Sequence, residues 1–201
     1  MNYPSKVIED AVNEFSKFPG IGKKTALRLV LHLLKGDERH ITAMGDVMAR
    51  LKTDIHYCQK CGNIADADLC GICNSHNRVQ TTVCLVEDLR DVMAIENTGQ
   101  YTGVYHILGG LISPIDGVGP EDLRINELIE RIQADGIEEV IMALSATMEG
   151  DTTVFYVSKK LKEKNIKITS ISRGIAFGGE LEYADEITLG RSIVNRIPYS
   201  A

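Results

Sequence analysis

The chain has 201 residues and a formal net charge of −6, from 22 basic and 28 acidic side chains. At roughly 100 to 200 residues per domain, this length holds one large domain or one medium domain with small appendages, and it excludes a large multidomain enzyme. With 44% hydrophobic and 25% charged residues, the composition is that of a soluble, folded protein, which excludes a membrane protein and a disordered chain.

The charge is distributed unequally along the chain. Residues 1–54 carry nine basic and seven acidic groups, residues 55–78 carry two of each, and residues 79–201 carry eleven basic and nineteen acidic groups. The acidic average therefore conceals a stretch, residues 16–36, with five basic side chains and no acid. Such a stretch can hold a phosphate backbone, and the alternative is a solvated helix face.

The first 54 residues are expected to be entirely helical. Apolar residues recurring every three or four positions predict helices over residues 5–15, 24–34 and 41–55. No apolar run approaches the roughly 20 residues that span a bilayer, and the N-terminus lacks the layout of a secretion signal. We therefore expect a cytoplasmic protein without a membrane partner.

The turn between the first two predicted helices reads Pro-Gly-Ile-Gly-Lys-Lys over residues 19–24. This turn resembles the helix-hairpin-helix motif of DNA-binding proteins. Glycines let backbone N–H groups approach a phosphate, and the following helix presents its positive end to it. The motif would hold the DNA backbone without reading bases, and the residues expected to do so are Gly20, Gly22, Lys23, Lys24 and Arg28.

Four of the five cysteines form two C-x2-C pairs with eight residues between them: Cys58 with Cys61, and Cys70 with Cys73. Two such pairs can place four thiolates around one zinc ion, and four protein ligands leave no open position, so the zinc should be structural. Two disulfides are the alternative.

Each cysteine pair is followed by a residue that tolerates a positive φ, Gly62 or Asn74, and we expect a turn of that kind at both positions. The fifth cysteine, Cys84, lies in an apolar strand and is expected to be an inert buried thiol.

Beyond the cysteines the pattern alternates between strand and helix, which predicts an α/β fold with a mostly parallel sheet and helices on both of its faces. A long loop rich in Gly and Pro, residues 109–119, interrupts the alternation, and loops of that length are often functional. The predicted strands cover residues 81–86, 104–108, 138–144 and 167–171, and the predicted helices cover residues 88–96, 120–135 and 152–164.

Three acidic residues follow strands of this predicted sheet. Glu87 ends the first strand, and Glu149 and Asp151 follow the third. Parallel strands bring such residues to one edge of the sheet, where carboxylates can bind Mg²⁺. The arrangement resembles the Toprim domain of topoisomerases and primases, although the second element there is Asp-x-Asp rather than Glu-x-Asp. In the alternative interpretation, Asp151 or Thr152 caps the next helix.

The order of these parts resembles the RecR family of bacterial recombination mediators over essentially the whole chain. Besides the cysteines, the resemblance rests on residues 18–26, 108–123 and 172–191. It implies the following divisions: 1–54, a helix-hairpin-helix DNA-binding region; 55–78, a four-cysteine zinc finger; 79–190, a Toprim domain; and 191–201, a tail that contacts a neighbouring subunit.

The resemblance also implies a function. Family members are non-enzymatic DNA repair and recombination mediators that, with RecO and with RecF at gap ends, help place RecA on single-stranded DNA coated by single-strand binding protein. They form homo-oligomers, from dimers to tetrameric rings that can encircle DNA, and the Toprim acids face RecO. The alternative function is a Mg²⁺-dependent Toprim nuclease, for which no positioned nucleophile or base can be identified.

Overall fold

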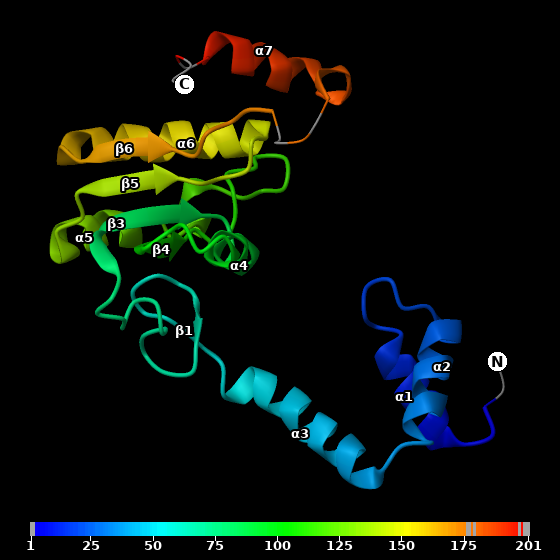
Figure 1. Cartoon of the computed structure of the whole chain (residues 1–201). Coiled ribbons are helices and arrows are strands. Elements are labelled where there is room, and N and C mark those ends of the chain that lie inside the picture. The colour runs from blue at the N-terminus through cyan, green and yellow to red at the C-terminus, as the bar shows by residue number, and fades with distance from the viewer. Residues whose placement is uncertain (1–2, 176–177, 179, 197, 199–201) are drawn as a thin grey trace. The chain divides into compact units, whose positions relative to one another are not determined.

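A computed structural model describes residues 3–175, 178, 180–196 and 198. The chain divides into two compact units between residues 55 and 56. The first unit is helical (Figure 1), with α1 (Lys6–Phe15), α2 (Lys23–Leu33) and α3 (Glu38–Thr53). The second unit contains the short strands β1 (His56–Tyr57) and β2 (Ile64–Ala65), followed by β3 (Val79–Val86), α4 (Leu89–Asn97), β4 (Gly103–Ile107), η1 (Pro120–Asp122), α5 (Ile125–Asp135), β5 (Glu139–Met142), α6 (Met148–Leu161), η2 (Lys162–Lys164), β6 (Lys167–Ser170), η3 (Leu181–Tyr183) and α7 (Glu186–Val194).

Helices α1 and α2 form a hairpin around a small apolar core. Its buried members are Val12 on α1 and Ala26 and Val30 on α2, which follow the helical spacing in the sequence. Helix α3 begins at Glu38, three residues before the predicted start, because the Asp37 carboxylate caps it by accepting a hydrogen bond from the Arg39 N–H.

The second unit is built on a four-stranded parallel sheet in the order β4-β3-β5-β6. At its centre, Val83 of β3 pairs with Val104 of β4 and with Val140 of β5. Successive residues of β3 point to opposite faces of the sheet, and both faces are apolar, which is typical of a parallel sheet covered on each side. The predicted parallel sheet is confirmed.

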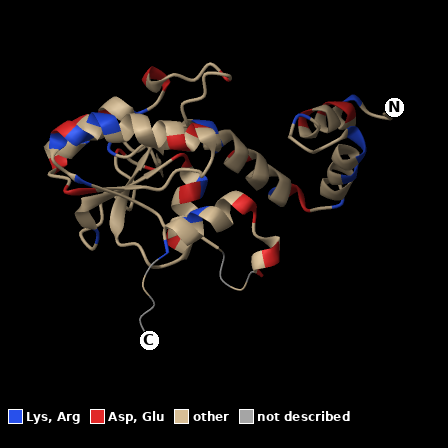
Figure 2. Ribbon diagram, turned by 90° about the horizontal axis from the view of Figure 1, so that it is seen from above, with Lys and Arg blue, Asp and Glu red and all other residues tan. Residues whose placement is uncertain are grey.

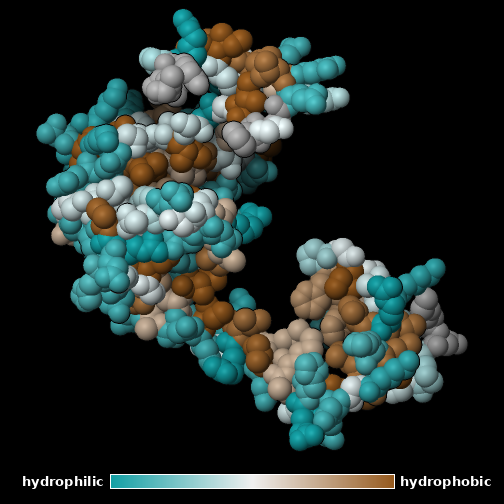
Figure 3. All heavy atoms as spheres, viewed as in Figure 1, coloured by the Kyte–Doolittle hydropathy of each residue, from teal (hydrophilic) through white to brown (hydrophobic). Residues whose placement is uncertain are grey.

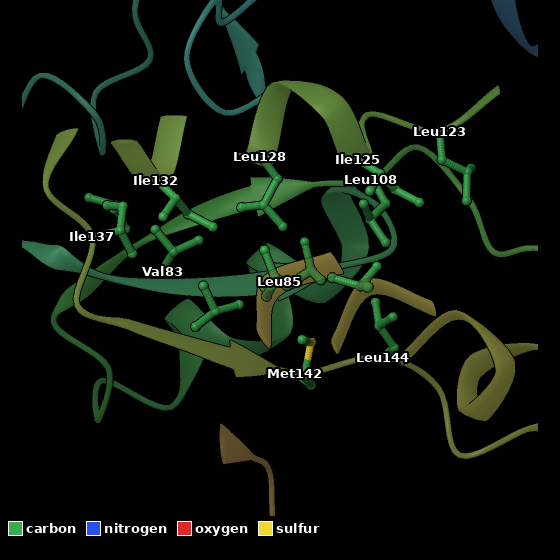
Figure 4. Close-up of a cluster of buried hydrophobic side chains, with 14 of the residues drawn as sticks. Val83, Leu85, Leu108, Leu123, Ile125, Leu128, Ile132, Ile137, Met142 and Leu144 are labelled. Atoms are coloured by element: carbon green, nitrogen blue, oxygen red, sulfur yellow. The ribbon is translucent and has the colours of Figure 1, made fainter. Parts of the chain in front are cut away.

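Helices cover both faces of this sheet, as expected. On one face, Val83 and Leu85 belong to a buried cluster with Leu128 of α5 and Val157 of α6, and Figure 4 shows the side chains of β3 and α5 pointing toward one another. On the other face, Cys84 and Val86 pack with Val92 of α4 and Tyr105 of β4. Each face therefore has its own core.

In the second unit, two predicted helices differ from those observed. The helix predicted over residues 120–135 is broken, because Leu123 is extended (φ −108°, ψ 153°) and its buried side chain belongs to the core. The helix predicted from residue 152 begins at Met148, because the Thr147 hydroxyl caps it by accepting a hydrogen bond from the Gly150 N–H. The strands β1 and β2 and the helix α7 were not predicted.

In the part of the chain that the structure describes, none of the helices has the length and apolar content needed to cross a bilayer.

Candidate nucleic-acid interface and zinc site

The four paired cysteines meet in one buried cluster. The sulfur atoms of Cys58, Cys61, Cys70 and Cys73 all lie within 4.8 Å of one another. The two that hydrogen-bond, those of Cys61 and Cys70, are 3.6 Å apart, against about 3.8 Å for two thiolates held 2.3 Å from a tetrahedral zinc ion. All four cysteines are free thiols, so the disulfide alternative is wrong.

The surroundings of the sulfurs fit a zinc ion. Backbone N–H groups point at two of them, from Asn63 to Cys61 at 3.4 Å and from Cys73 to Cys70 at 3.5 Å. The hydrogen bond between Cys61 and Cys70 lowers the pKa of the Cys70 thiol and raises the pKa of the Cys61 thiol, because one thiolate is stabilised by its neighbour's proton. A divalent cation allows all four thiols to ionise together, and the site is a structural zinc centre.

Tight turns bring the cysteines of each pair together. In the first turn, the Gly62 N–H donates to the Cys58 carbonyl at 2.9 Å, and Gly62 adopts the predicted positive φ of 76°. In the second turn, the Asn74 N–H donates to the Cys70 carbonyl at 3.0 Å. The expectation of a positive φ at Asn74 is wrong, because the chain continues in a right-handed turn, with the Ser75 N–H donating to the Ile72 carbonyl.

The zinc turns are attached to the sheet. The Ile107 N–H on β4 donates to the Cys61 carbonyl at 2.8 Å, and the side chain of Ile72 packs against the zinc cluster and against the cores on both faces of the sheet. Lys60 also pairs with Asp135 at the end of α5, at 3.1 Å. The zinc turns are therefore attached to the sheet unit through β4 and through the end of α5.

The helix-hairpin-helix turn forms an open, positive helix end. Gly20 has a φ of 77°, and Gly22 is the N-cap of α2, where it offers no side chain to bond the first N–H groups of the helix. Neither acidic residues nor other atoms crowd this end: the first turn of α2 contains no acid, and a Cβ added to Gly22 would have no atom within 4 Å. A phosphate oxygen fits such a place.

Three cations surround this helix end. Lys23, Lys24 and Arg28 are exposed and form no ion pair within the described residues, whereas Lys17, just before the turn, is paired with Glu14 at 2.7 Å. Their charges are therefore available to a ligand. The turn and the three side chains together can bind a phosphate backbone through its charge and without base contacts.

The three acids of the sheet domain do not come together as a metal site. Glu87 follows β3 and accepts a hydrogen bond from the Ser145 hydroxyl at 3.2 Å, while Glu149 and Asp151 lie in the first turn of α6 rather than in a loop. Among the described residues, the four paired cysteines are the metal-ligating side chains that lie close enough together to hold one ion.

Both carboxylate oxygens of Asp151 are held by arginines. Arg173 binds one oxygen at 2.6 Å and Arg191 approaches the other at 3.5 Å. The hydrogen bond from Arg173 lowers the pKa of Asp151. These arginines lie far from Asp151 in the sequence, so no local spacing predicts the pairing. The helix cap is Thr147, so the alternative interpretation, in which Asp151 or Thr152 caps the helix, is wrong.

Four family models match successive parts of the chain. They describe the RecR helix-hairpin-helix (residues 8–51), the RecR four-cysteine zinc finger domain (residues 55–75), a Toprim domain (residues 81–172) and the RecR C-terminal region (residues 174–197). The fold and the two sites therefore define a DNA-binding protein of the class that combines a helix-hairpin-helix, a four-cysteine zinc finger and a Toprim domain.

Three relatives are similar to this chain over nearly their whole length. The recombination protein RecR of Cytophaga hutchinsonii is 59% identical over 197 residues, covering 98% of this chain and 96% of the relative. That of Bacteroides thetaiotaomicron is 59% identical over 194 residues, covering 96% and 95%. That of Flavobacterium johnsoniae is 56% identical over 199 residues, covering 99% and 97%. The chain belongs to the RecR family of recombination proteins.

Proposed function

We propose that this chain is a DNA repair and recombination mediator of the bacterial cytoplasm, without catalysis of its own. It holds the phosphate backbone of DNA and, with RecO and RecF, helps load RecA onto single-stranded gaps coated by single-strand binding protein. In this proposal residues 1–54 bind DNA, residues 55–78 hold zinc, residues 79–190 meet protein partners and residues 191–201 contact another subunit. Reduced zinc thiolates suit the cytoplasm.

One observation carries the DNA-binding part of the proposal: the uncapped start of α2 with three unpaired cations around it. Backbone N–H groups and cations at one helix end form a sequence-independent phosphate site. We assign this role to Gly20, Gly22, Lys23, Lys24 and Arg28.

Several subunits are needed for firm binding, because one chain contributes a single such turn. Two helices support a homo-oligomer, up to a tetrameric ring. Helices α3 and α7 contain no buried residue among those described, and apolar side chains stand exposed on both (Figure 3), among them Val47 (58%), Leu51 (56%), Ile187 (70%) and Val194 (76%). Exposed apolar patches on a protein surface typically mark contacts with another protein.

The DNA site is tested by the double substitution Lys23→Ala with Arg28→Ala. Binding to random-sequence duplexes should weaken equally for all sequences. The dependence of log K on log salt should flatten by about 1.8 per bound chain, since each lost phosphate contact removes about 0.9. The matched control is Lys6→Ala with Arg39→Ala, which removes two exposed cations that are already paired with carboxylates. Unchanged affinity at low salt in the first variant would place the DNA site elsewhere.

The partner face is tested by Glu87→Gln with Glu149→Gln. We expect weaker binding of purified RecO and unchanged DNA binding, because a basic partner loses two opposite charges. Glu130→Gln, an exposed position on α5, is the control. Cleavage of nicked, gapped or supercoiled DNA with Mg²⁺ or Mn²⁺ that disappears in Glu87→Ala would overturn the mediator in favour of a nuclease. Light scattering that shows a monomer at every concentration would overturn the ring.

A further inference from the structure

Most cations of the second unit pair with acids, and four of those that do not lie close together in the chain. Eight of them pair with carboxylates: Lys60, Arg78, Arg90, Arg124, Arg131, Lys167, Arg173 and Arg191. Among the ion pairs of the described part of this unit, none includes Arg196 or any of four lysines close together in the chain, Lys159, Lys160, Lys162 and Lys164.

These four lysines lie at the C-terminal end of α6 and in η2. Residues 159–167 contain five lysines and one acid, Glu163, a net charge of +4 within residues 79–201, whose total is −8. Lys159, Lys160 and Lys162 are exposed. Figure 2 shows blue gathered at one end of this helix and red at the other. The second unit therefore has a concentrated positive surface in an acidic background.

The helix dipole explains only a small part of this concentration. The C-terminal end of a helix carries about half an elementary negative charge, which one nearby cation balances. The acids on this segment and on the neighbouring strand are also insufficient, since Glu163 is a single charge and Glu139 of β5 is already paired with Lys167 of β6 at 3.2 Å. Most of the positive charge of the four lysines is left for a ligand.

An exposed aromatic side chain stands on the same face of the helix. Phe155 is 73% exposed, and it precedes Lys159 by four residues and Lys162 by seven, the spacing that places residues on one face of a helix. An exposed phenyl ring costs free energy in water. Aromatic rings interleaved with cations are typical of surfaces that bind single-stranded nucleic acid, where bases stack on the rings and phosphates meet the cations.

We propose that this face of α6 is a second nucleic-acid contact, in which Phe155 stacks on a base of single-stranded DNA and Lys159 and Lys162 hold the adjoining phosphates. At 1.5 Å per residue, Phe155 and Lys162 are roughly 10 Å apart along the helix. The proposal extends the proposed function, since it presupposes that the chain meets DNA, but it concerns a different unit of the chain.

The stacking is tested with Phe155→Trp. The chain contains no tryptophan, so the substitution introduces a single fluorescent reporter that can still stack. Titration with an oligothymidylate of about 30 nucleotides should quench this fluorescence. The control is Met93→Trp, at a position 57% exposed on α4, where no quenching is expected. Unchanged fluorescence of the introduced tryptophan with the oligonucleotide bound would overturn the proposal.

The phosphate contacts are tested with Lys159→Ala plus Lys162→Ala, two exposed sites where alanine favours the helix. The salt dependence of oligothymidylate binding should flatten by about 1.4, since each single-strand phosphate contact contributes about 0.7. Lys6→Ala with Arg39→Ala should leave it unchanged. An unchanged slope in the α6 variant would refute the phosphate contacts. If its oligomer mass also changed, the lysines would belong to a contact with an acidic surface of a second copy.

A third variant separates this proposal from the helix-hairpin-helix site. Lys23→Ala with Arg28→Ala, combined with Phe155→Trp, should still show quenching when the oligonucleotide is in excess. If quenching were lost here but present in Phe155→Trp alone, the α6 face would not bind DNA independently and the proposal would fail. If Lys23→Ala with Arg28→Ala changed nothing while quenching persisted, the hairpin site would fail and the α6 site would stand.

Discussion

Gly150, in the first turn of α6, lies so close to the backbone carbonyl of Ser145 that no residue with a Cβ fits at this position. A Cβ at this position would lie 1.9 Å from the Ser145 carbonyl oxygen and 2.9 Å from its carbon. Both atoms are backbone, so a side-chain rotation cannot relieve the overlap. Replacing a glycine within a helix by alanine ordinarily stabilises the protein by about 1 kcal/mol. At position 150 the overlap with the Ser145 carbonyl should make the same replacement destabilising.

We predict that Gly150→Ala lowers the free energy of unfolding of the second unit by about 1 to 3 kcal/mol. The overlap must be relieved by a backbone shift, which costs about 1 to 3 kcal/mol in packed proteins. The same shift disturbs the hydrogen bond from the Gly150 N–H to the Thr147 hydroxyl (3.1 Å), and the loss of such a cap costs about 1 kcal/mol. The gain in helix propensity offsets only part of these costs.

The assay is urea unfolding followed by near-ultraviolet circular dichroism of the aromatic pair Tyr101 and Tyr105, whose rings lie 5.1 Å apart in the second unit. The control is Gly71→Ala in the same unit, where a Cβ would have no atom within 4 Å. It should leave stability unchanged or raise it by about 0.4 to 1 kcal/mol, through the entropy of the unfolded chain. If Gly150→Ala were as stable as Gly71→Ala, the argument from the Ser145 carbonyl would be refuted.

Three further predictions concern titratable and metal-binding groups. Burial lowers the pKa of His106 to about 3. Below about pH 6.5 the imidazole therefore takes up a proton in the unfolded state but stays neutral in the folded state. The free energy of unfolding should therefore decrease as the pH drops from 6.5 to 5, with a slope that approaches about 1.4 kcal/mol per pH unit. If urea unfolding gave the same dependence on pH for His106→Gln as for the unchanged chain, this prediction would be contradicted. Removing zinc with a chelator should expose four reactive thiols per chain in a native thiol titration while Cys84, buried in the sheet, stays silent; a count of none would refute the zinc site. Arg173→Ala should raise the pKa of Asp151, since it removes the hydrogen bond that lowers it; an unchanged carboxylate titration by nuclear magnetic resonance would show that the contact is absent in solution.

The parallel sheet and the zinc site were predictable because each has a local signature. A strand buried on both faces needs apolar residues at every position, as in residues 83–86. The zinc ligands follow from spacing alone, since two residues between cysteines set the geometry of the turn. The hairpin turn also has a local signature. Gly20 adopts the positive φ that the turn requires, and Gly22, at the N-cap of α2, leaves the first N–H groups of the helix without a side-chain cap.

The features that depend on distant residues were not predictable. Asp151 is paired with Arg173 and Arg191, 22 and 40 residues further along the chain, and no periodicity links them. The break before α5 depends on burial of Leu123 in a core assembled from several elements. The start of α6 was missed because Thr147 resembles any other loop threonine until its hydroxyl is seen to accept the Gly150 N–H.

The hydrogen bond from Ile107 to Cys61 has a consequence for solubility. Strand β4 is at the border of the sheet, and such a border has unpaired backbone groups to which a strand of another molecule can add. The zinc turn occupies one of these groups, because the Cys61 carbonyl accepts the hydrogen bond of the Ile107 N–H. Loss of the metal would free the Ile107 N–H at the edge of the sheet. We therefore expect zinc-depleted chains to aggregate by pairing strands of other molecules with β4, before their helices unfold.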